Sequence, residues 1–206
     1  LLRAKQAGAP MTESQMVGQA ALVFGASQMT TAHTLTWTLF LLAQHPEVMR
    51  ELVDEISESS DPGLRIGPPD STTGIMPANS TSVLDRVIRE SMRVLPASAY
   101  SQRVTNGPTE LNGAPLKPNS LVIFSQFMTH RNEQLFESAS EFRPDRWKTI
   151  RPTGYEYLPF GGGAKLCLGA PLAMSILNIV LPMTLRKAGL QVVPHTEVNG
   201  RVISTM

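Results

Sequence analysis

The sequence has a single cysteine, almost no excess of charge and no long apolar run, and each lack excludes a class of protein. Cys167 is the one cysteine among 206 residues, so an internal disulfide and a multi-cysteine zinc site are excluded, and a reducing, cytoplasmic location is expected. Lys and Arg number 18 and Asp and Glu 17, which gives no indication of nucleic acid or anionic lipid as a partner. The longest apolar stretch, 35–43, is shorter than the roughly 20 residues of a membrane-spanning helix.

The chain starts at Leu1 rather than at a methionine. We therefore interpret it as part of a longer protein, in which a preceding segment carrying a membrane anchor stays an open alternative. No membrane segment is expected within the chain itself.

Helix signals dominate the first half of the sequence and return near its end. Thr12 and Gln15 have the capping-box spacing ahead of a long apolar-periodic segment, which predicts a helix over 12–44. Apolar residues at helical spacing predict another helix over 82–95. A last helix is predicted over 169–187.

The remaining segments carry turn signals. Between 97 and 124, short strand-like pieces separated by Asn106-Gly107 and Asn112-Gly113 predict small hairpins and sheets. Residues 132–159 show little periodicity and predict an irregular meander. Gly189 is expected to cap the last helix, followed by a strand-like tail. The expected fold class is mainly α with small β-sheets.

The segment around the single cysteine, FGGGAKLCLG at 160–169, is the most informative part of the chain. A free cysteine is usually a small buried apolar residue. Here the surrounding glycines let the backbone approach a flat ligand, and the following helix offers free N–H groups that favour a thiolate at Cys167. A Cys–His nucleophile using His130 or His195 is an alternative.

This segment resembles the cysteine-ligand loop of the cytochrome P-450 superfamily: Phe, two residues, Gly, one residue, a basic residue, one residue, Cys, one residue, Gly. The resemblance implies that Cys167 is the axial ligand of the iron of haem b. It also implies that Phe160, Gly161, Lys165 and Gly169 contact the cofactor. The family usually has Arg where Lys165 stands, and lysine keeps the charge for a haem propionate but loses the bidentate geometry.

Two further motifs follow the order found in the family. Glu90-Ser-Met-Arg93 resembles the ExxR motif, whose spacing places both side chains on one helical face. Residues 142–147 resemble the PERF-type segment, which implies that Arg146 joins Glu90 and Arg93 in a buried charge cluster supporting the cysteine loop. We interpret the three as structural. A second ExxR at 47–50 shows that the motif alone carries little weight.

Arg103 follows the ExxR helix, in a predicted strand. It matches a family arginine that binds a haem propionate, and a solvated strand residue is the alternative. His130 is a further candidate for this role, although a loop histidine is usually satisfied by local partners.

Residues 26–31 resemble the oxygen-activation segment of the family, which implies a catalytic role for Thr30. The Thr30 hydroxyl is expected to donate to the carbonyl of Ala26 and to bend the helix. Ser27 replaces the usual glycine, and Met29 stands where the family has an acidic residue. Because methionine cannot relay protons, the expected proton path lacks a partner.

The resemblance extends over most of the chain and implies one partial domain, the C-terminal half of the cytochrome P-450 fold, with the N-terminal half absent. It implies a haem–thiolate monooxygenase that inserts one oxygen atom of O2 into a lipophilic small molecule. Electrons would come from a separate partner, a ferredoxin or flavoprotein reductase, because the sequence has no flavin or nicotinamide fingerprint. Met29 favours a peroxide-driven or rearranging enzyme as one alternative. A truncated, inactive product with uncovered apolar faces is another.

Overall fold

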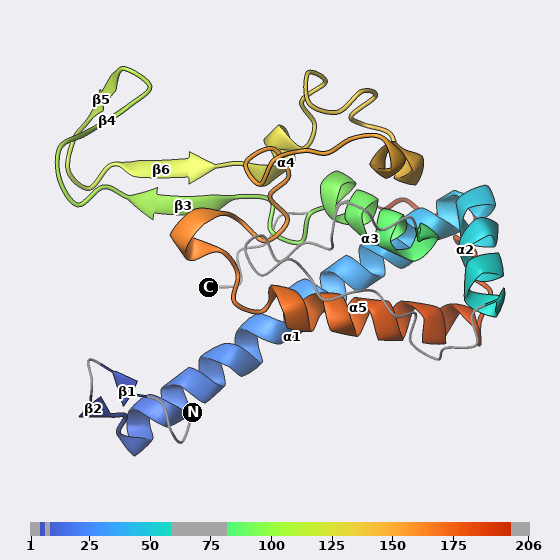
Figure 1. Ribbon diagram of the computed structural model, residues 1–206, viewed down its shortest axis with the longest axis horizontal. Coiled ribbons are helices and arrows are strands. Elements are labelled where there is room, and N and C mark those ends of the chain that lie inside the picture. Colours follow the sequence, from blue (N-terminus) through green and yellow to red (C-terminus); the bar gives the residue numbers. More distant parts are fainter. Residues whose placement is uncertain (1–4, 7–8, 59–81, 199–206) are drawn as a thin grey trace.

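Helices form the body of the protein, and three two-stranded sheets, β1–β2, β3–β6 and β4–β5, lie at one end of it (Figure 1). The computed structural model describes residues 5–6, 9–58 and 82–198. The expected class, mainly α with small β-sheets, is confirmed. In chain order the elements are β1 (Lys5–Gln6), β2 (Ala9–Pro10), α1 (Glu13–Gln44), α2 (Pro46–Glu58), α3 (Val83–Val94), β3 (Ser101–Val104), β4 (Thr109–Leu111), β5 (Ala114–Leu116), β6 (Leu121–Phe124), α4 (Gln126–Thr129), the 3-10 helices η1 (Pro144–Lys148) and η2 (Gly163–Lys165), and α5 (Ala170–Leu185).

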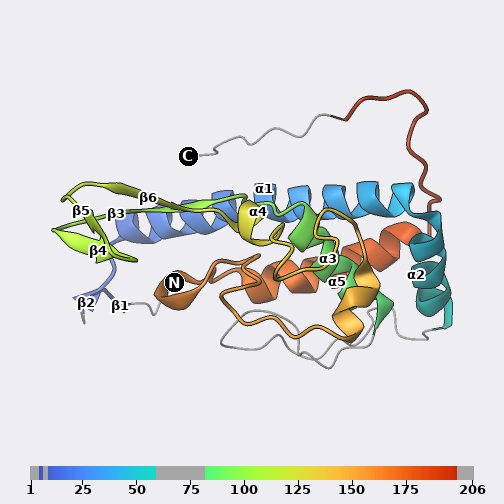
Figure 2. The ribbon, with the colours of Figure 1, turned by 90° about the horizontal axis from the view of Figure 1, so that it is seen from above.

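The long helix α1 begins at the capping box that the sequence indicates. Gln15 N–H donates to Thr12 Oγ1 at 3.3 Å, and Thr12 N–H donates to Gln15 Oε1 at 2.8 Å. The buried residues of α1 all lie in its last third, from Thr34 to Leu42. The rest of the helix extends past α5, as the two ribbon views show (Figures 1 and 2). Its first two thirds therefore lack cover from the described part of the chain.

Helix α3 is buried along its whole length, although its sequence is amphipathic. All twelve of its residues are buried. Its first N–H groups are capped twice: Ser82 Oγ accepts from Asp85 N–H at 3.0 Å, and the Glu55 carboxylate of α2 accepts from Val83 and Leu84 N–H at 2.6 and 3.0 Å. A carboxylate there also suits the positive end of the helix dipole. The polar face of α3 is thus inside the protein and needs polar partners there.

The main core lies where the end of α1 meets α2, α3 and α5. Each fully buried aliphatic side chain contributes about 1.5–3 kcal/mol through the hydrophobic effect. A second, aromatic cluster lies under the meander on the polar side of α3 and consists of Phe136, Ala139, Trp147 and Tyr157. The main core contains Leu41, Leu42, Leu52, Ile56, Val83, Leu84, Val87, Ile88, Met92, Val94, Phe142, Met174, Leu177, Leu181 and Leu185.

Only one of the two Asn-Gly pairs forms a hairpin turn. Strands β4 and β5 pair through Asn112 and Gly113, whose φ angles of 48° and 81° are those of a type I′ turn. The prediction of a hairpin at Asn106-Gly107 is wrong, because β3 forms an antiparallel pair with β6 rather than with β4. Asn106-Gly107 instead lies in the connection that leads out to the β4–β5 hairpin.

The end of the last helix also differs from expectation. Helix α5 ends at Leu185, and its C-cap is Arg186, whose N–H donates to Pro182 O at 3.0 Å. Gly189 therefore does not cap the helix. The described residues after Gly189, up to 198, contain no strand, so the expected strand-like tail is also wrong.

Candidate functional site

The carboxylate of Glu90 is the centre of a buried charge cluster between α3 and the meander. Its Oε1 accepts from Arg93 Nη2 at 2.8 Å, Arg146 Nε at 2.9 Å and the backbone N–H of Arg143 at 2.9 Å. Its Oε2 accepts from Arg93 Nε at 3.0 Å and Trp147 Nε1 at 2.9 Å. Glu90 and Arg93 have no exposed surface. The structure thus brings together the three residues of the predicted cluster.

The two arginines use their remaining N–H groups on backbone carbonyls. Arg93 donates to His130 O, Ala139 O and Glu141 O at 2.6 to 2.8 Å. Arg146 donates to the carbonyls of Glu137 and Ser138. A buried ion pair is stable only when its other hydrogen-bonding groups are also satisfied. Because all of these carbonyls except that of His130 belong to the meander, the cluster holds that irregular segment against α3.

Trp147 contributes a donor that the sequence argument did not anticipate. This residue lies in the segment 142–147, and its indole N–H adds a hydrogen bond to Glu90. The side chain also packs on Tyr157, with ring centroids 4.7 Å apart. The signal that could have found it is the residue type, because a buried tryptophan usually needs a partner for its N–H.

The cysteine loop leaves the meander and enters α5 with the Cys167 side chain exposed. Cys167 N–H donates to Phe160 O at 2.9 Å, which closes the loop. Gly161 and Gly163 have φ angles of 76° and 64°, a region that favours glycine. A Cβ on Gly169 would stand 3.8 Å from the Cys167 sulfur, and this residue is also the N-cap of α5.

These features fit a thiolate ligand facing a flat cofactor. The sulfur is exposed, Gly169 lies beside it, and the next residue, Leu168, has an apolar side chain that is 94% exposed. Lys165 is exposed in η2 on the same loop. An exposed cysteine on such a loop agrees with the haem–thiolate ligand that the resemblance of this segment implies.

The other residues named from the sequence lie in different settings. Arg103 is exposed on β3 and donates to the neighbouring carbonyl of Gln102 at 2.7 Å, so its propionate role stays a prediction. His195 is exposed in the C-terminal tail. His130 is fully buried, and its Nε2 accepts from Leu158 N–H at 2.8 Å. That nitrogen is engaged, so it cannot serve as a base for a cysteine nucleophile.

Thr30 makes the predicted hydrogen bond, but the helix does not open there. Its hydroxyl donates to Ala26 O at 3.1 Å. Thr34 and Thr38 make the same bond one and two turns later, at 2.9 and 2.8 Å. Helix α1 is continuous from Glu13 to Gln44, so the hydrogen bond of Thr30 does not interrupt the helix. Thr30 differs from the other two in being exposed, whereas Thr34 and Thr38 are buried.

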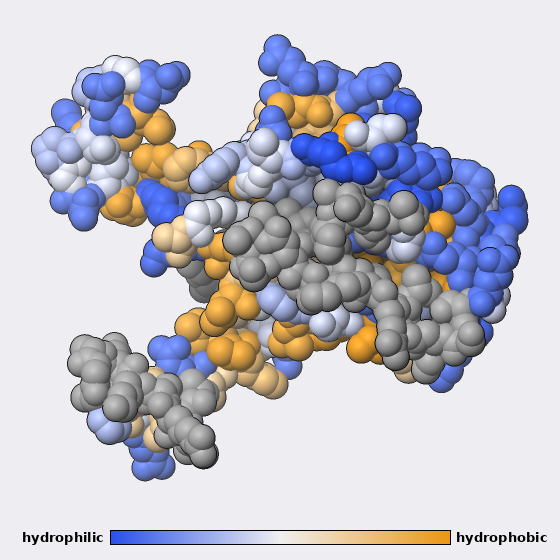
Figure 3. Space-filling view, in the orientation of Figure 1, coloured by the Kyte–Doolittle hydropathy of each residue, from blue (hydrophilic) through white to orange (hydrophobic). Residues whose placement is uncertain are grey.

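Apolar side chains gather around the open side between the projecting sheet and the free end of α1 (Figure 3). Exposed apolar side chains belong to α1, to β3 and β6, to the cysteine loop and to α5. This surface is of the kind that takes an apolar ligand or another part of a protein. The exposed apolar residues of these elements are Val17, Leu22, Val23, Phe24, Met29, Val104, Leu121, Ile123, Phe124, Leu168, Leu172, Ile179 and Met183.

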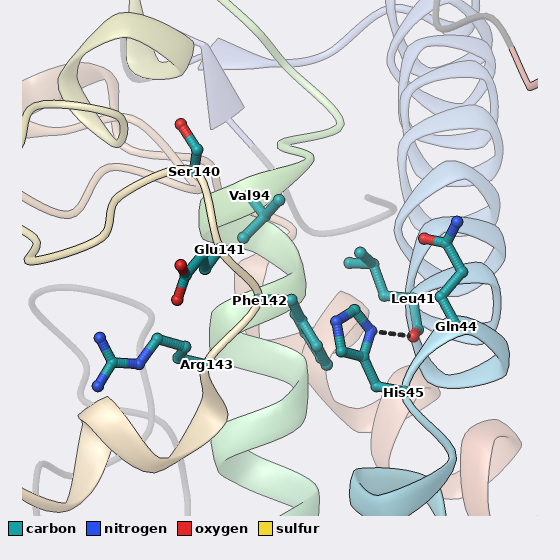
Figure 4. Close-up of a pocket in the computed structure, with 8 residues that line it drawn as sticks. All are labelled: Leu41, Gln44, His45, Val94, Ser140, Glu141, Phe142 and Arg143. Atoms are coloured by element: carbon teal, nitrogen blue, oxygen red, sulfur yellow. Dashed lines mark hydrogen bonds between the residues drawn. The ribbon is translucent and has the colours of Figure 1, made fainter.

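A pocket of about 420 Å³ lies elsewhere, between the end of α1 and the meander (Figure 4). The His45 ring, after the end of α1, faces the ring of Phe142 in the meander, and the two ring centroids are 4.9 Å apart. The Nδ1 atom of His45 lies 2.8 Å from Leu41 O. No residue predicted to bind a cofactor lines it, although Glu141 and Arg143 also contribute backbone groups to the Glu90 cluster. The lining residues are Leu41, Gln44, His45, Val94, Ser140, Glu141, Phe142 and Arg143.

Comparison with known proteins identifies the family. The family model for Cytochrome P450 matches residues 1–204, and the chain therefore belongs to the cytochrome P450 family. Cytochrome P450 3A13 of Mus musculus is 28% identical over 201 residues, and the pentalenene oxygenase of Streptomyces avermitilis is 29% identical over 202. A solved zebrafish cytochrome P450 with progesterone matches with a TM-score of 0.69 and 27% identity. Membership of this family implies a haem cofactor.

The chain spans about two fifths of the length of these relatives. The alignment to the mouse protein covers 95% of this chain and 38% of the relative, and that to the pentalenene oxygenase covers 97% and 43%. The zebrafish structure is matched over 89% of this chain and 40% of its own length. Among the helices of the residues described here, none is long and apolar enough to cross a membrane.

Proposed function

We propose that the complete protein is a haem–thiolate monooxygenase that inserts one oxygen atom of O2 into a lipophilic small molecule. Haem b held by a cysteine thiolate supplies the redox chemistry, because the thiolate donates electron density to iron and favours cleavage of the O–O bond. Electrons come from a separate ferredoxin or flavoprotein reductase. The observation that carries the proposal is the exposed Cys167 sulfur on a loop that hydrogen bonds connect, through His130 and Leu158, with Arg93 of the buried Glu90 cluster.

The proposal gives each of the named residues a role. Cys167 presents its sulfur beside Gly169, where an added Cβ would stand 3.8 Å from it, in van der Waals contact. Lys165 offers an ammonium for a propionate, and Arg103 a guanidinium from β3. Glu90 and its two arginines keep the loop in place and do not touch the reacting atoms. The one-domain division, with the cysteine loop at 160–169, is part of the same proposal.

The lipophilic substrate class is supported by the relatives and by the surface of this chain. The names of two relatives refer to pentalenene and cyclooctat-9-en-7-ol, and the zebrafish protein was solved with progesterone. All three are lipophilic compounds. The exposed apolar side chains of α1 and β6 agree with a ligand of this kind. A cytoplasmic location is proposed from the single cysteine alone.

A peroxide-driven enzyme is the second candidate, and one observation favours it. Met29 is 48% exposed on the same turn of α1 as Thr30, at the position where the family has an acidic residue. A thioether neither donates nor accepts protons at neutral pH. In a reaction driven by O2, proton delivery then depends on the Thr30 hydroxyl with water or on a substrate hydroxyl. In a reaction driven by peroxide, the peroxide itself carries the protons.

Labelled oxygen separates the two candidates. The complete protein is incubated with a lipophilic test substrate under ¹⁸O2 with a ferredoxin and its reductase, and in parallel with unlabelled peroxide under the same gas. Monooxygenation predicts ¹⁸O in the product of the first reaction. Product that forms only with peroxide, and carries no label, refutes the monooxygenase proposal. A Met29→Asp variant is expected to raise the oxygen-driven rate.

A further inference from the structure

A line of hydrogen bonds connects the buried charge cluster with the cysteine loop, and His130 stands in its middle. On one side, Arg93 Nη1 donates to the His130 carbonyl at 2.7 Å. On the other, the His130 imidazole accepts from Leu158 N–H through Nε2 at 2.8 Å. The two partners of His130 lie far apart in sequence, so this residue joins α3 to the segment that enters the cysteine loop.

The line continues from Leu158 to the cysteine through two backbone bonds. Gly161 N–H donates to Leu158 O at 3.0 Å, and Cys167 N–H donates to Phe160 O at 2.9 Å. The segment is also fixed by Tyr157, whose hydroxyl donates to Arg89 O at 2.9 Å. A displacement of the backbone at Leu158 therefore also moves the nearby carbonyl of Phe160, which accepts the hydrogen bond from Cys167 N–H.

The His130 ring is held in the orientation that this role needs. It is fully buried, and it packs against Tyr157 and Phe136 with centroid distances of 5.3 and 6.3 Å. Burial, and then the charge of Arg93, lower the pKa of His130 to about 4. The ring is therefore neutral near pH 7, with its proton on Nδ1 and a lone pair on Nε2.

We propose that His130 is a positioning residue, which fixes the backbone of Leu158 through Nε2 and thereby sets the position of the Cys167 sulfur. The proposal rests on the proposed function, because the position of the sulfur matters through the iron it binds. The competing explanation is that the ring only fills space between Phe136 and Tyr157.

Two variants of the complete haem-loaded protein separate these explanations. His130→Phe keeps an aromatic ring of similar size and removes the acceptor, whereas His130→Gln places an amide oxygen within reach of Leu158 N–H. In His130→Phe, hydrogen exchange at the Leu158 and Cys167 amides is expected to be about tenfold faster or more. The thiolate-type Soret band of the reduced carbon monoxide complex is expected to weaken. His130→Gln is expected to restore both.

Leu52→Ala is the matched control, since Leu52 is fully buried in the core on α2, an element without a predicted cofactor ligand. It is expected to lower stability and leave the Soret band unchanged. The proposal is overturned if His130→Phe keeps wild-type exchange and spectrum, or if Leu52→Ala reproduces its spectral change. Should His130→Phe not fold, the wild type decides: a Leu158 amide that exchanges as fast as that of Tyr155 overturns the proposal.

The proposed function fails separately from this inference. A wild-type protein without a thiolate-type band refutes the haem–thiolate proposal. The hydrogen-exchange rates of the Leu158 and Cys167 amides still decide whether His130 fixes the position of the cysteine loop.

Discussion

Replacing Glu90 by glutamine removes the charge at the centre of the cluster and keeps its shape. The carboxylate accepts bonds at both oxygens, three at Oε1 and two at Oε2. A glutamine keeps one oxygen and turns an NH2 group toward the donors at the other. Arg93 and Arg146 remain buried without an opposite charge. Removing one partner of a buried pair costs about 3–5 kcal/mol, a large part of a domain stability of about 5–15 kcal/mol.

The chain supplies its own control for this variant. Glu47 and Arg50 have the same spacing on α2, and both are exposed, so Glu47→Gln is expected to change the free energy of unfolding by about 0.5 kcal/mol or less. Urea unfolding of the complete protein, followed by circular dichroism, measures both variants. A loss below about 1 kcal/mol in Glu90→Gln, or equal losses in the two variants, would refute the assignment of Glu90 as the centre of the cluster.

Three further predictions concern single side chains. Trp147→Phe removes one buried donor to Glu90 and should cost about 1–3 kcal/mol in urea unfolding. The control is Trp37→Phe, at a half-buried residue of α1 away from the charge cluster, and an equal loss in the two variants would contradict this. Because the pKa of His130 is lowered to about 4, its neutral form contributes stability above pH 6.5, and about 3 kcal/mol of this is lost as the pH falls from 6.5 to 4. The same pH dependence of the urea midpoint in His130→Gln would show that another group is responsible. Thr30→Ala should lower product formed per O2 consumed about tenfold or more, whereas Thr34→Ala, which loses the same type of helix bond, should lower only stability; equal effects would remove Thr30 from the reaction.

Local signals in the sequence predicted local structure well. The capping box at Thr12 and Gln15 needs only residues three apart, and it is present in the structure. Asn112-Gly113 allows the two positive φ angles of a type I′ turn, and the hairpin forms there. Asn106-Gly107 carries the same signal and forms no hairpin, because pairing of β3 with β6 is decided by distant residues.

Burial of polar residues could not be predicted from local pattern. The polar face of α3 looks like a solvated surface, yet the meander covers it. His130 looked like a loop residue satisfied by neighbours, whereas its partner Leu158 is 28 residues away. The ExxR resemblance predicted the partners of Glu90, and the geometry added the indole of Trp147. Resemblance thus supplied long-range contacts that periodicity cannot show.

Gly189 shows a further limit of local signals. A glycine after a helical pattern favours a C-cap, yet α5 ends four residues earlier at Leu185. Pro182 inside the helix has no N–H to donate, and the last turn closes through the bond from Arg186 N–H to Pro182 O.

The central claim is that Cys167 binds the haem iron as a thiolate. The most direct measurement is the absorption spectrum of the complete protein, reduced under carbon monoxide, in the wild type and in Cys167→Ala. The account predicts a thiolate-type Soret band in the wild type and its loss in Cys167→Ala. A thiolate-type band that persists in Cys167→Ala, or its absence from a folded, haem-loaded wild type, would contradict the account.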